Sequence, residues 1–509
     1  MRLNKKILLI LLAVGTANAV FAFSLLIPFK GYQVPAIGYN LPGDIGGPGN
    51  LTEAYRWNVP VITYAFDESF IRYFGTNGIA AIEAAIKILN DIPPVSQIPL
   101  VTNVTGFFGP TETNVDFFIN DEIVPTDAYG PPNFLAQQAQ LYDLKSEALG
   151  LLVEEMGLAE SERWVYDLRA RSVYTIGGVT FTNYVVIQNS FDPITYQPTN
   201  VINGVNYGYT MFDPFVPGVA DAVEYPHDPT TPYTFSSVSS KILFFGDYYQ
   251  RLSRDDIGGL RFLLSKNNLV TENLINTGNS TITRATGALA GSVSNQSPWT
   301  IWLGTSNVIG TNVLLFTNLT ATATNIPLVT QALRPGVDKI RFVRVDFDSL
   351  IGQSFVPVTN IYTDVYISNG VFFAQKVQRV MTAPDIVFRA FDLGLSGNPA
   401  FPNQTRRTAT AGWNNNDAIN GRAPQGGPGV ITPPITIDFT DIYPFFVNDT
   451  GDFIGGGLPD LNDLNAFPGG AWGSFDGTTN APIVYPEFQG LTVDIIRQII
   501  NNNATIINN

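Results

Sequence analysis

Glycine and proline occur throughout the chain and divide it into short segments. The 509 residues include 46 glycines and 35 prolines, and both residue types interrupt regular structure and favour turns. Aromatic residues make up 12% of the chain and charged residues only 14%, a composition that excludes a disordered chain. We therefore expect a folded, turn-rich protein of about three domains with more strand than helix.

The ionic composition excludes several classes of partner and cofactor. The chain has 28 lysines and arginines against 43 aspartates and glutamates, a net charge of −15. Nucleic acids and anionic lipid surfaces both attract basic segments, so neither partner is expected. The absence of cysteine excludes disulfides, a thiolate nucleophile and cysteine-bound metal, and the single histidine, His227, excludes a histidine-rich metal site.

Residues 1–22 have the order of regions found in a secretory signal peptide. Three basic residues precede the apolar run at residues 7–14, and small residues follow at Ala19 and Ala22, where cleavage would occur. The alternative is a membrane anchor, because residues 20–28 are also apolar, but Gly15 and Asn18 interrupt the stretch. We therefore expect a secreted protein, extracellular or at the cell surface, with no membrane partner after cleavage. The short leader with its flanking lysines is typical of bacteria.

The remaining chain divides into four regions by composition and periodicity. Residues 23–50 are rich in glycine and proline and predict an extended linker. Residues 51–270 mix strand and helix patterns, which indicates an α+β domain. Residues 271–400 contain short β-type runs between turns, the pattern of an antiparallel sandwich. Residues 401–509 predict a turn-rich β region with an Asn-rich tail.

The α+β region contains one strong strand pattern and three helical ones. Residues 59–66 alternate in polarity and predict a strand, and residues 79–89 have helical spacing up to the prolines at 93 and 94. A second helical pattern, Leu141 to Leu151, is expected to end near Gly157 and to bury Leu149 and Leu152. Residues 253–256 form a capping-box pattern that opens a third helix.

Taken in order, these elements resemble the matrixin-type metzincin metalloprotease domain over about residues 51–265. The family's first strand has the form Trp-x-x-x-x-Ile-Thr-Tyr-x-Phe, as in Trp57–Phe66, and its first helix contains Ala-Ile-x-x-Ala, as in residues 81–85. A strand carrying Asp-Phe is similar to residues 115–118. Met211 and residues 252–260 resemble the methionine turn and the last helix. The resemblance implies a metzincin-like α+β domain followed by a β-rich, antiparallel sandwich-like region.

The resemblance also places the family's catalytic positions, and none is retained. The active-site helix lines up with residues 148–160, so the three zinc-binding histidines would fall at Gly150, Glu154 and Glu160 and the general-base glutamate at Leu151. Zinc hydrolysis needs three neutral imidazoles and a base for the metal-bound water. We therefore expect a degenerate domain without zinc. A solvated helix end is the simpler explanation of Glu154 and Glu160; a carboxylate site for a hard cation is the alternative.

Other candidate sites are weaker. Two acidic turns are candidates for binding calcium as a cofactor, but they lack EF-hand spacing and ordinary Asx-turns explain them more simply. Their residues are Asp449, Asp452, Asp460, Asn462 and Asp463. His227 lies between two prolines without a nucleophile elbow and is expected to be a loop residue. The adjacent acids at 67–68, 154–155 and 255–256 could serve glycosidase chemistry, and the tryptophans at 299, 302, 413 and 472 could stack on sugars. Solvated charge and core packing are the simpler explanations.

Two functions follow from the sequence. The favoured one is an exported, non-catalytic structural, adhesive or cell-surface protein built on a pseudo-metalloprotease domain and β-domains. Its partner would be another protein or a surface polymer, or a second copy in self-assembly. The alternative is a secreted peptidase or glycosidase with an unorthodox carboxylate-based site.

Overall fold

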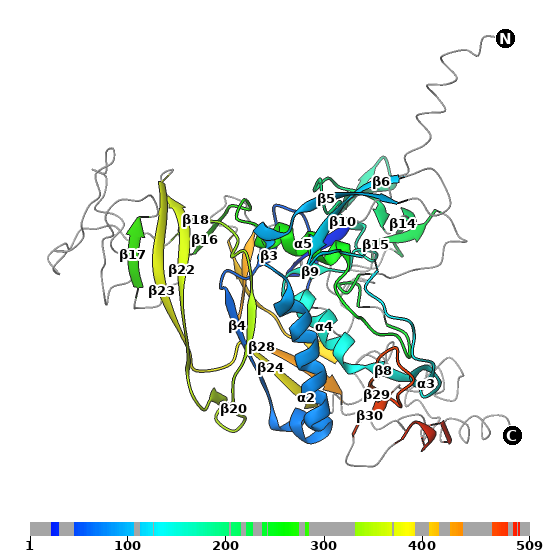
Figure 1. The fold of residues 1–509 in the computed structure, drawn as a ribbon. Helices are drawn as coiled ribbons and strands as arrows, with labels where there is room; N and C mark the ends of the chain where they lie inside the picture. The colour runs from blue at the N-terminus through cyan, green and yellow to red at the C-terminus, as the bar shows by residue number, and fades with distance from the viewer. Residues whose placement is uncertain are drawn as a thin grey trace, which may run out of the picture.

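The computed structural model describes a fold built mainly of strands around a few helices (Figure 1). The described residues are 22–29, 45–105, 112–125, 127–202, 205–214, 220–227, 237–241, 243–273, 280–284, 331–368, 371–391, 407–416, 428–440, 471–486, 492–495 and 497–498. Within them lie the helices α2, α3, α4 and α5 and the 3₁₀-helix η1 (Val95–Gln97).

The central sheet joins strands that are far apart in the sequence. Its order is β19 (Arg341–Arg344), β4 (Val61–Phe66), β24 (Ile386–Phe391), β28 (Ile435–Thr440) and β25 (Arg407–Ala409). The first four strands are parallel, and β25 is antiparallel to β28. The strand predicted at 59–66 is present as β4. However, the sheet crosses the domain boundaries expected at residues 270 and 400, and two strands of the expected antiparallel sandwich pair in parallel with the first region.

Helix α2 (Glu68–Asp91) covers one face of this sheet (Figure 1). Asp67 caps its first turn by accepting from the backbone of Ser69, and the helix ends before the prolines at 93 and 94, as the sequence predicts. The rings of Phe70 and Phe74 lie against Phe439 of β28, with centroids 6.3 and 6.0 Å away. These buried aromatic contacts fix the helix on the sheet.

Helix α4 (Leu144–Glu155) lies behind α2 in the core (Figure 1). Leu149 and Leu152 are fully buried, which confirms the pattern read from the sequence. The chain turns at Gly157, whose φ is +106°, and a Cβ there would lie 2.5 Å from the carbonyl oxygen of Tyr55. Only glycine meets both requirements.

The segment expected to be a linker contributes two buried strands. β1 (Phe23–Ile27) pairs with β2 (Gly47–Gly49), β9 (Leu158–Ala159) and β12 (Ser190–Phe191). Every residue of β1 is buried. The linker prediction is therefore wrong for residues 23–27 and 47–49. The apolar run at 23–27 is buried in a sheet, and the glycine-rich segment at 47–49 pairs with it.

Helix α5 (Arg254–Leu264) begins with the predicted capping box, in which Ser253 and Asp256 bond each other's backbone. It packs against β1 and against β6 (Glu112–Ile119), which pairs with β5 (Leu100–Thr105) and β7 (Glu122–Ile123). Met211, expected in a turn, instead lies in β14 (Val205–Phe212) opposite Ala222 of β15 (Asp221–Pro226). Met211 is half-buried between the exposed residues Thr210 and Phe212 and is paired within a strand, so the methionine-turn assignment is wrong.

A second five-stranded sheet stands beside the central one. Its order is β16 (Val270–Asn273), β18 (Gln331–Arg334), β22 (Val358–Ser368), β23 (Val371–Met381) and β17 (Ser280–Arg284), all antiparallel. Buried charges attach it to the first region: Glu272 accepts from Nε of Arg56 and from Nη1 of Arg334, both at 2.9 Å. Arg334 also pairs with Asp364.

Smaller elements complete the described chain. β10 (Tyr166–Ile176) and β11 (Val179–Gln188) form a hairpin, and β13 (Val201–Ile202) extends the β14–β15 pair. The remaining helix and strands are α3 (Phe134–Gln138), β3 (Tyr55–Arg56), β8 (Leu141–Asp143), β20 (Phe347–Asp348), β21 (Gln353–Ser354), β26 (Gly412–Asn415), β27 (Gly429–Thr432), β29 (Ala471–Ser474) and β30 (Ile483–Val484).

Candidate functional site

The three positions that the resemblance assigns to zinc ligands lie around the side chain of one lysine, Lys241. Helix α4 carries Gly150 and Glu154, and Glu160 follows β9. Nζ of Lys241 lies 2.7 Å from Oε2 of Glu154 and 3.6 Å from Oε1 of Glu160. The side chains of Lys241 and Glu154 are each only 3% exposed. The residues predicted from the sequence are therefore brought together, but around a cation supplied by the chain itself.

Gly150 makes room for this lysine. A Cβ at position 150 would lie 3.0 Å from Cγ of Lys241 and 3.5 Å from the carbonyl oxygen of Val238. The lysine stem therefore occupies the space that a side chain on this face of α4 would need. A histidine at 150 and a lysine at 241 exclude each other unless one of them moves.

The turn at residues 237–241 holds Lys241 in place. Lys241 has φ +54°, in the left-handed region. The Asp256 carboxylate at the start of α5 accepts from the backbone N–H groups of Val238 at 2.9 Å and Ser239 at 3.0 Å. Nη2 of Arg407 donates to the carbonyl oxygen of Lys241 at 3.0 Å. Asp256, the acidic member of the α5 capping box, thus also positions the lysine.

Backbone and side-chain groups close the site from the other sides. The backbone N–H of Ile45 donates to Oε1 of Glu154 at 3.3 Å, so the segment before β2 lies over the carboxylate. Arg163 binds Glu160 with Nη1 3.1 Å from Oε2. Glu154 and Glu160 were expected at a solvated helix end. That expectation is wrong for Glu154, which is buried, and Glu160 is only 12% exposed at its side chain.

Further carboxyl groups are buried around this site. Burial, followed by the charge of Glu154, raises the pKa of Glu155 well above its usual value, and neither of its carboxyl oxygens has a hydrogen-bond partner in the described structure. Burial raises the pKa of Glu162 to about 7, although the hydroxyls of Ser161 and Ser240 donate to its carboxylate. Burial also raises the pKa of Asp255 well above its usual value. The adjacent acids at 154–155 and 255–256 are therefore not solvated charges.

The position of the family's general base is part of the core. Leu151 is fully buried within the main apolar cluster. It presents no acid or base to the site around Lys241. Lys241 itself was missed by the sequence reasoning, because no spacing rule links residue 241 to residues 150–160. The one available signal was a lone lysine in a serine-rich segment.

The remaining sequence candidates do not join this site. His227 is exposed and lies against Tyr225, with ring centroids 5.9 Å apart. Trp472 is buried, and Trp413 packs edge-on against Tyr55. Trp299, Trp302 and all five calcium candidates (Asp449, Asp452, Asp460, Asn462 and Asp463) lie outside the described residues. Among the described residues, no group of three or more metal-binding side chains is found.

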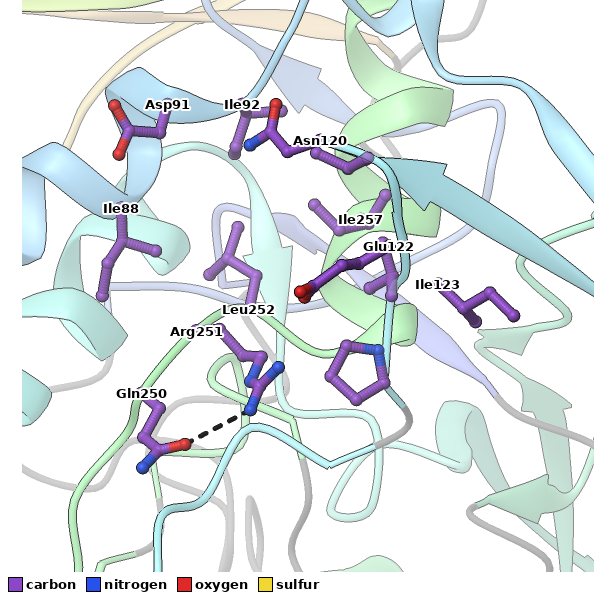
Figure 2. A pocket seen from close by; sticks show the side chains of 13 residues that line it. Ile88, Asp91, Ile92, Asn120, Glu122, Ile123, Gln250, Arg251, Leu252 and Ile257 are labelled. Carbon is purple, nitrogen blue, oxygen red and sulfur yellow. Dashed lines mark hydrogen bonds between the residues drawn. The ribbon is translucent and has the colours of Figure 1, made fainter. Parts of the chain in front are cut away.

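A separate cavity of about 430 Å³ lies between the end of α2, the β6–β7 turn and the segment before α5 (Figure 2). The carboxylate of Glu122 and the guanidinium of Arg251 extend into it from different elements (Figure 2). Its lining residues are Ile88, Asp91, Ile92, Ile119, Asn120, Glu122, Ile123, Val124, Pro125, Gln250, Arg251, Leu252 and Ile257. None of the predicted catalytic positions lines it, so this cavity and the lysine site are distinct.

Comparison with known proteins adds no relative. The chain matches no protein-family model, no curated protein and no solved structure. Within the described residues, no helix has the length and apolar character needed to span a membrane.

Proposed function

We propose that this chain is an exported, non-catalytic structural or adhesive protein of the cell surface or its surroundings, built on a pseudo-metalloprotease domain. The domain would provide a rigid scaffold for the β-rich parts of the chain. Its partner would be another protein, a surface polymer or a second copy of the chain.

The observation that carries the proposal is the ammonium of Lys241 between Glu154 and Glu160. A metal ion and an ammonium cannot share one small buried site, because like charges there repel strongly. The three imidazole ligands of the family's zinc site are replaced here by a glycine and two glutamates. These changes act together, since Gly150 gives the lysine its space and Glu154 gives it a counter-ion.

The exposed face of the hairpin β10–β11 supports a binding role. Tyr174 and Phe181 stack across the two strands with centroids 5.7 Å apart, and both are exposed. Ile176 and Val179 form the next cross-strand pair on the same face and are exposed as well. Exposed apolar surface on an unpaired two-stranded ribbon favours association with another chain or polymer.

The alternative is a hydrolase that uses carboxylates. Such an enzyme needs an acid and a base that a substrate can reach. Glu154 and Glu155 are buried, and no predicted catalytic position lines the cavity of Figure 2. We therefore rank this alternative second.

Electron microscopy of the native protein, combined with peptide and glycan hydrolysis assays, tests the proposal. We expect filaments, lattices or surface-bound particles and no turnover. The matched variant Phe181→Ser should weaken assembly without unfolding the chain, whereas Phe388→Ser, which changes a buried ring, should unfold it. Turnover that disappears in Glu154→Gln or Glu160→Gln would overturn the proposal in favour of the hydrolase.

A further inference from the structure

A buried amine and a buried carboxyl group lie in direct contact at the lysine site. Nζ of Lys241 is 2.7 Å from Oε2 of Glu154, and both side chains are almost fully excluded from solvent. We propose that these two groups condense into an isopeptide bond that joins α4 to the turn at residues 237–241. The proposal goes beyond the structural role given above and does not depend on it.

The condensation needs no added reagent. A proton first passes from the Lys241 ammonium to the Glu154 carboxylate, which leaves a neutral amine and a neutral acid. Nζ then attacks Cδ of Glu154, the new C–N bond forms, and Oε2 departs as water. Both hydrogens of that water come from Nζ, so an ammonium and a carboxylate become an amide and one water molecule, with no change of oxidation state.

Neighbouring groups are placed to assist each step. The backbone N–H of Ile45, 3.3 Å from Oε1 of Glu154, would stabilise the negative charge that develops on this oxygen in the tetrahedral intermediate. Oε1 of Glu160 lies 3.6 Å from Nζ and would accept a proton from the attacking nitrogen and pass it to the departing oxygen. Arg163 holds Glu160 in this position.

Burial favours the reaction in two ways. A low-dielectric surrounding disfavours the charged forms of both groups and so favours the neutral, reactive pair. Fixed contact between reacting groups is equivalent to an effective concentration of roughly 10⁵–10⁸ M. The same exclusion of solvent protects the amide from hydrolysis once the water has left.

The bond would serve the role that disulfides serve in other exported proteins. It would close a loop of 87 residues in a chain without any cysteine. Closing a long loop restricts the unfolded chain and stabilises the folded one. Unlike a disulfide, it would resist reducing agents.

The test is the intact mass of the purified wild-type chain under denaturing conditions, with the N-terminus of the same sample sequenced to fix the reference mass. We expect a mass lower by one water molecule, and a branched peptide after proteolysis in which residue 241 is joined to residue 154. A chain of full mass that yields only linear peptides would overturn the proposal. The structural role would still stand, because it rests on the Lys241 ammonium between Glu154 and Glu160, which an unreacted chain keeps.

Lys241→Arg is the matched control. Arginine keeps the positive charge beside Glu154, but its guanidinium is a far weaker nucleophile, so this variant should have the full mass. Loss of one water from Lys241→Arg as well would place the modification elsewhere and refute the assignment. Glu160→Gln should still fold and should accumulate the lighter species more slowly after refolding. An unchanged rate would remove Glu160 from the mechanism.

Discussion

Glu272 should be among the most important single charges for the stability of this chain. Its carboxylate is fully buried and accepts from Arg56 and Arg334 at 2.9 Å and from Asn58 at 3.3 Å. It joins the second sheet to the first region, since Arg56 lies in β3 and Arg334 in β18. Replacing it with alanine would leave the two guanidinium groups with one remaining carboxylate, Asp364.

The expected cost follows from these distances. Two unit charges about 3 Å apart attract each other by about 6 kcal/mol at an effective dielectric constant of about 20. Part of this is offset by the desolvation that the pair suffers on folding, and removing one partner of a buried pair typically costs 3–5 kcal/mol. We therefore expect Glu272→Ala to lower the free energy of unfolding by about 4 kcal/mol, and Glu272→Gln by less, because the amide oxygen still accepts one hydrogen bond.

Equilibrium unfolding in urea, followed by circular dichroism and by tryptophan fluorescence, measures this cost. The control is Glu83→Ala, because Glu83 forms a comparable but solvent-exposed pair with Arg344 at 2.7 Å. Exposed pairs contribute about 0–1 kcal/mol. Equal, small changes in the free energy of unfolding for Glu272→Ala and Glu83→Ala would refute the reasoning. Burial would then make no difference to how much a charged pair stabilises the fold.

Three further predictions concern the first region. Leu149→Ala, at a fully buried position of α4, should lower stability by about 2–5 kcal/mol in the same urea assay; a harmless truncation would contradict its core position. Glu162 has a folded pKa of about 7 against an ordinary value of 4.5, so stability should fall by about 3 kcal/mol as pH rises from about 4.5 to about 7, and Glu162→Gln should remove that slope. A redesigned chain should bind zinc, as measured by calorimetry, only when the lysine is removed together with the ligand changes. This chain combines Lys241→Ala with Gly150→His, Glu154→His and Glu160→His.

Local patterns in the sequence predicted strand β4, the ends of α2 and α4 and the start of α5. They did not predict the start of α2 or helix α3, and Leu141, expected in the second helix, lies in strand β8. The boundaries of α2, α4 and α5 follow from Asp67, Gly157 and Ser253, whose effects act within a few residues along the chain. The central sheet was not predicted, because β4 pairs with β19 across 280 residues and with β24 across 322 residues. Short apolar runs between turns have the same pattern in parallel and antiparallel sheets, so composition alone could not distinguish them.

Burial of charge was the second property that sequence could not supply. An acidic pair at a helix end, such as Glu154–Glu155, is usually solvated. Glu154 is buried instead because a cation from a distant part of the sequence lies beside it. That cation is Lys241. The Asp256 carboxylate positions it indirectly, by accepting hydrogen bonds from the backbone of the turn that carries the lysine. The resemblance therefore placed residues 150, 154 and 160 at a common site, while the occupant of that site depended on the tertiary structure.

The lysine site also makes each single substitution towards a zinc site costly. Gly150→His alone would place a side chain against the stem of Lys241. The Cβ atom of the new histidine would lie only 3.0 Å from Cγ of the lysine. Glu154→His alone would remove the nearest counter-ion of a buried ammonium, which is among the costlier single changes in a protein core. Each single step towards a zinc site thus lowers stability before any metal affinity appears. The residues around Lys241 therefore form one mutually dependent set, in which a zinc site would require several simultaneous substitutions.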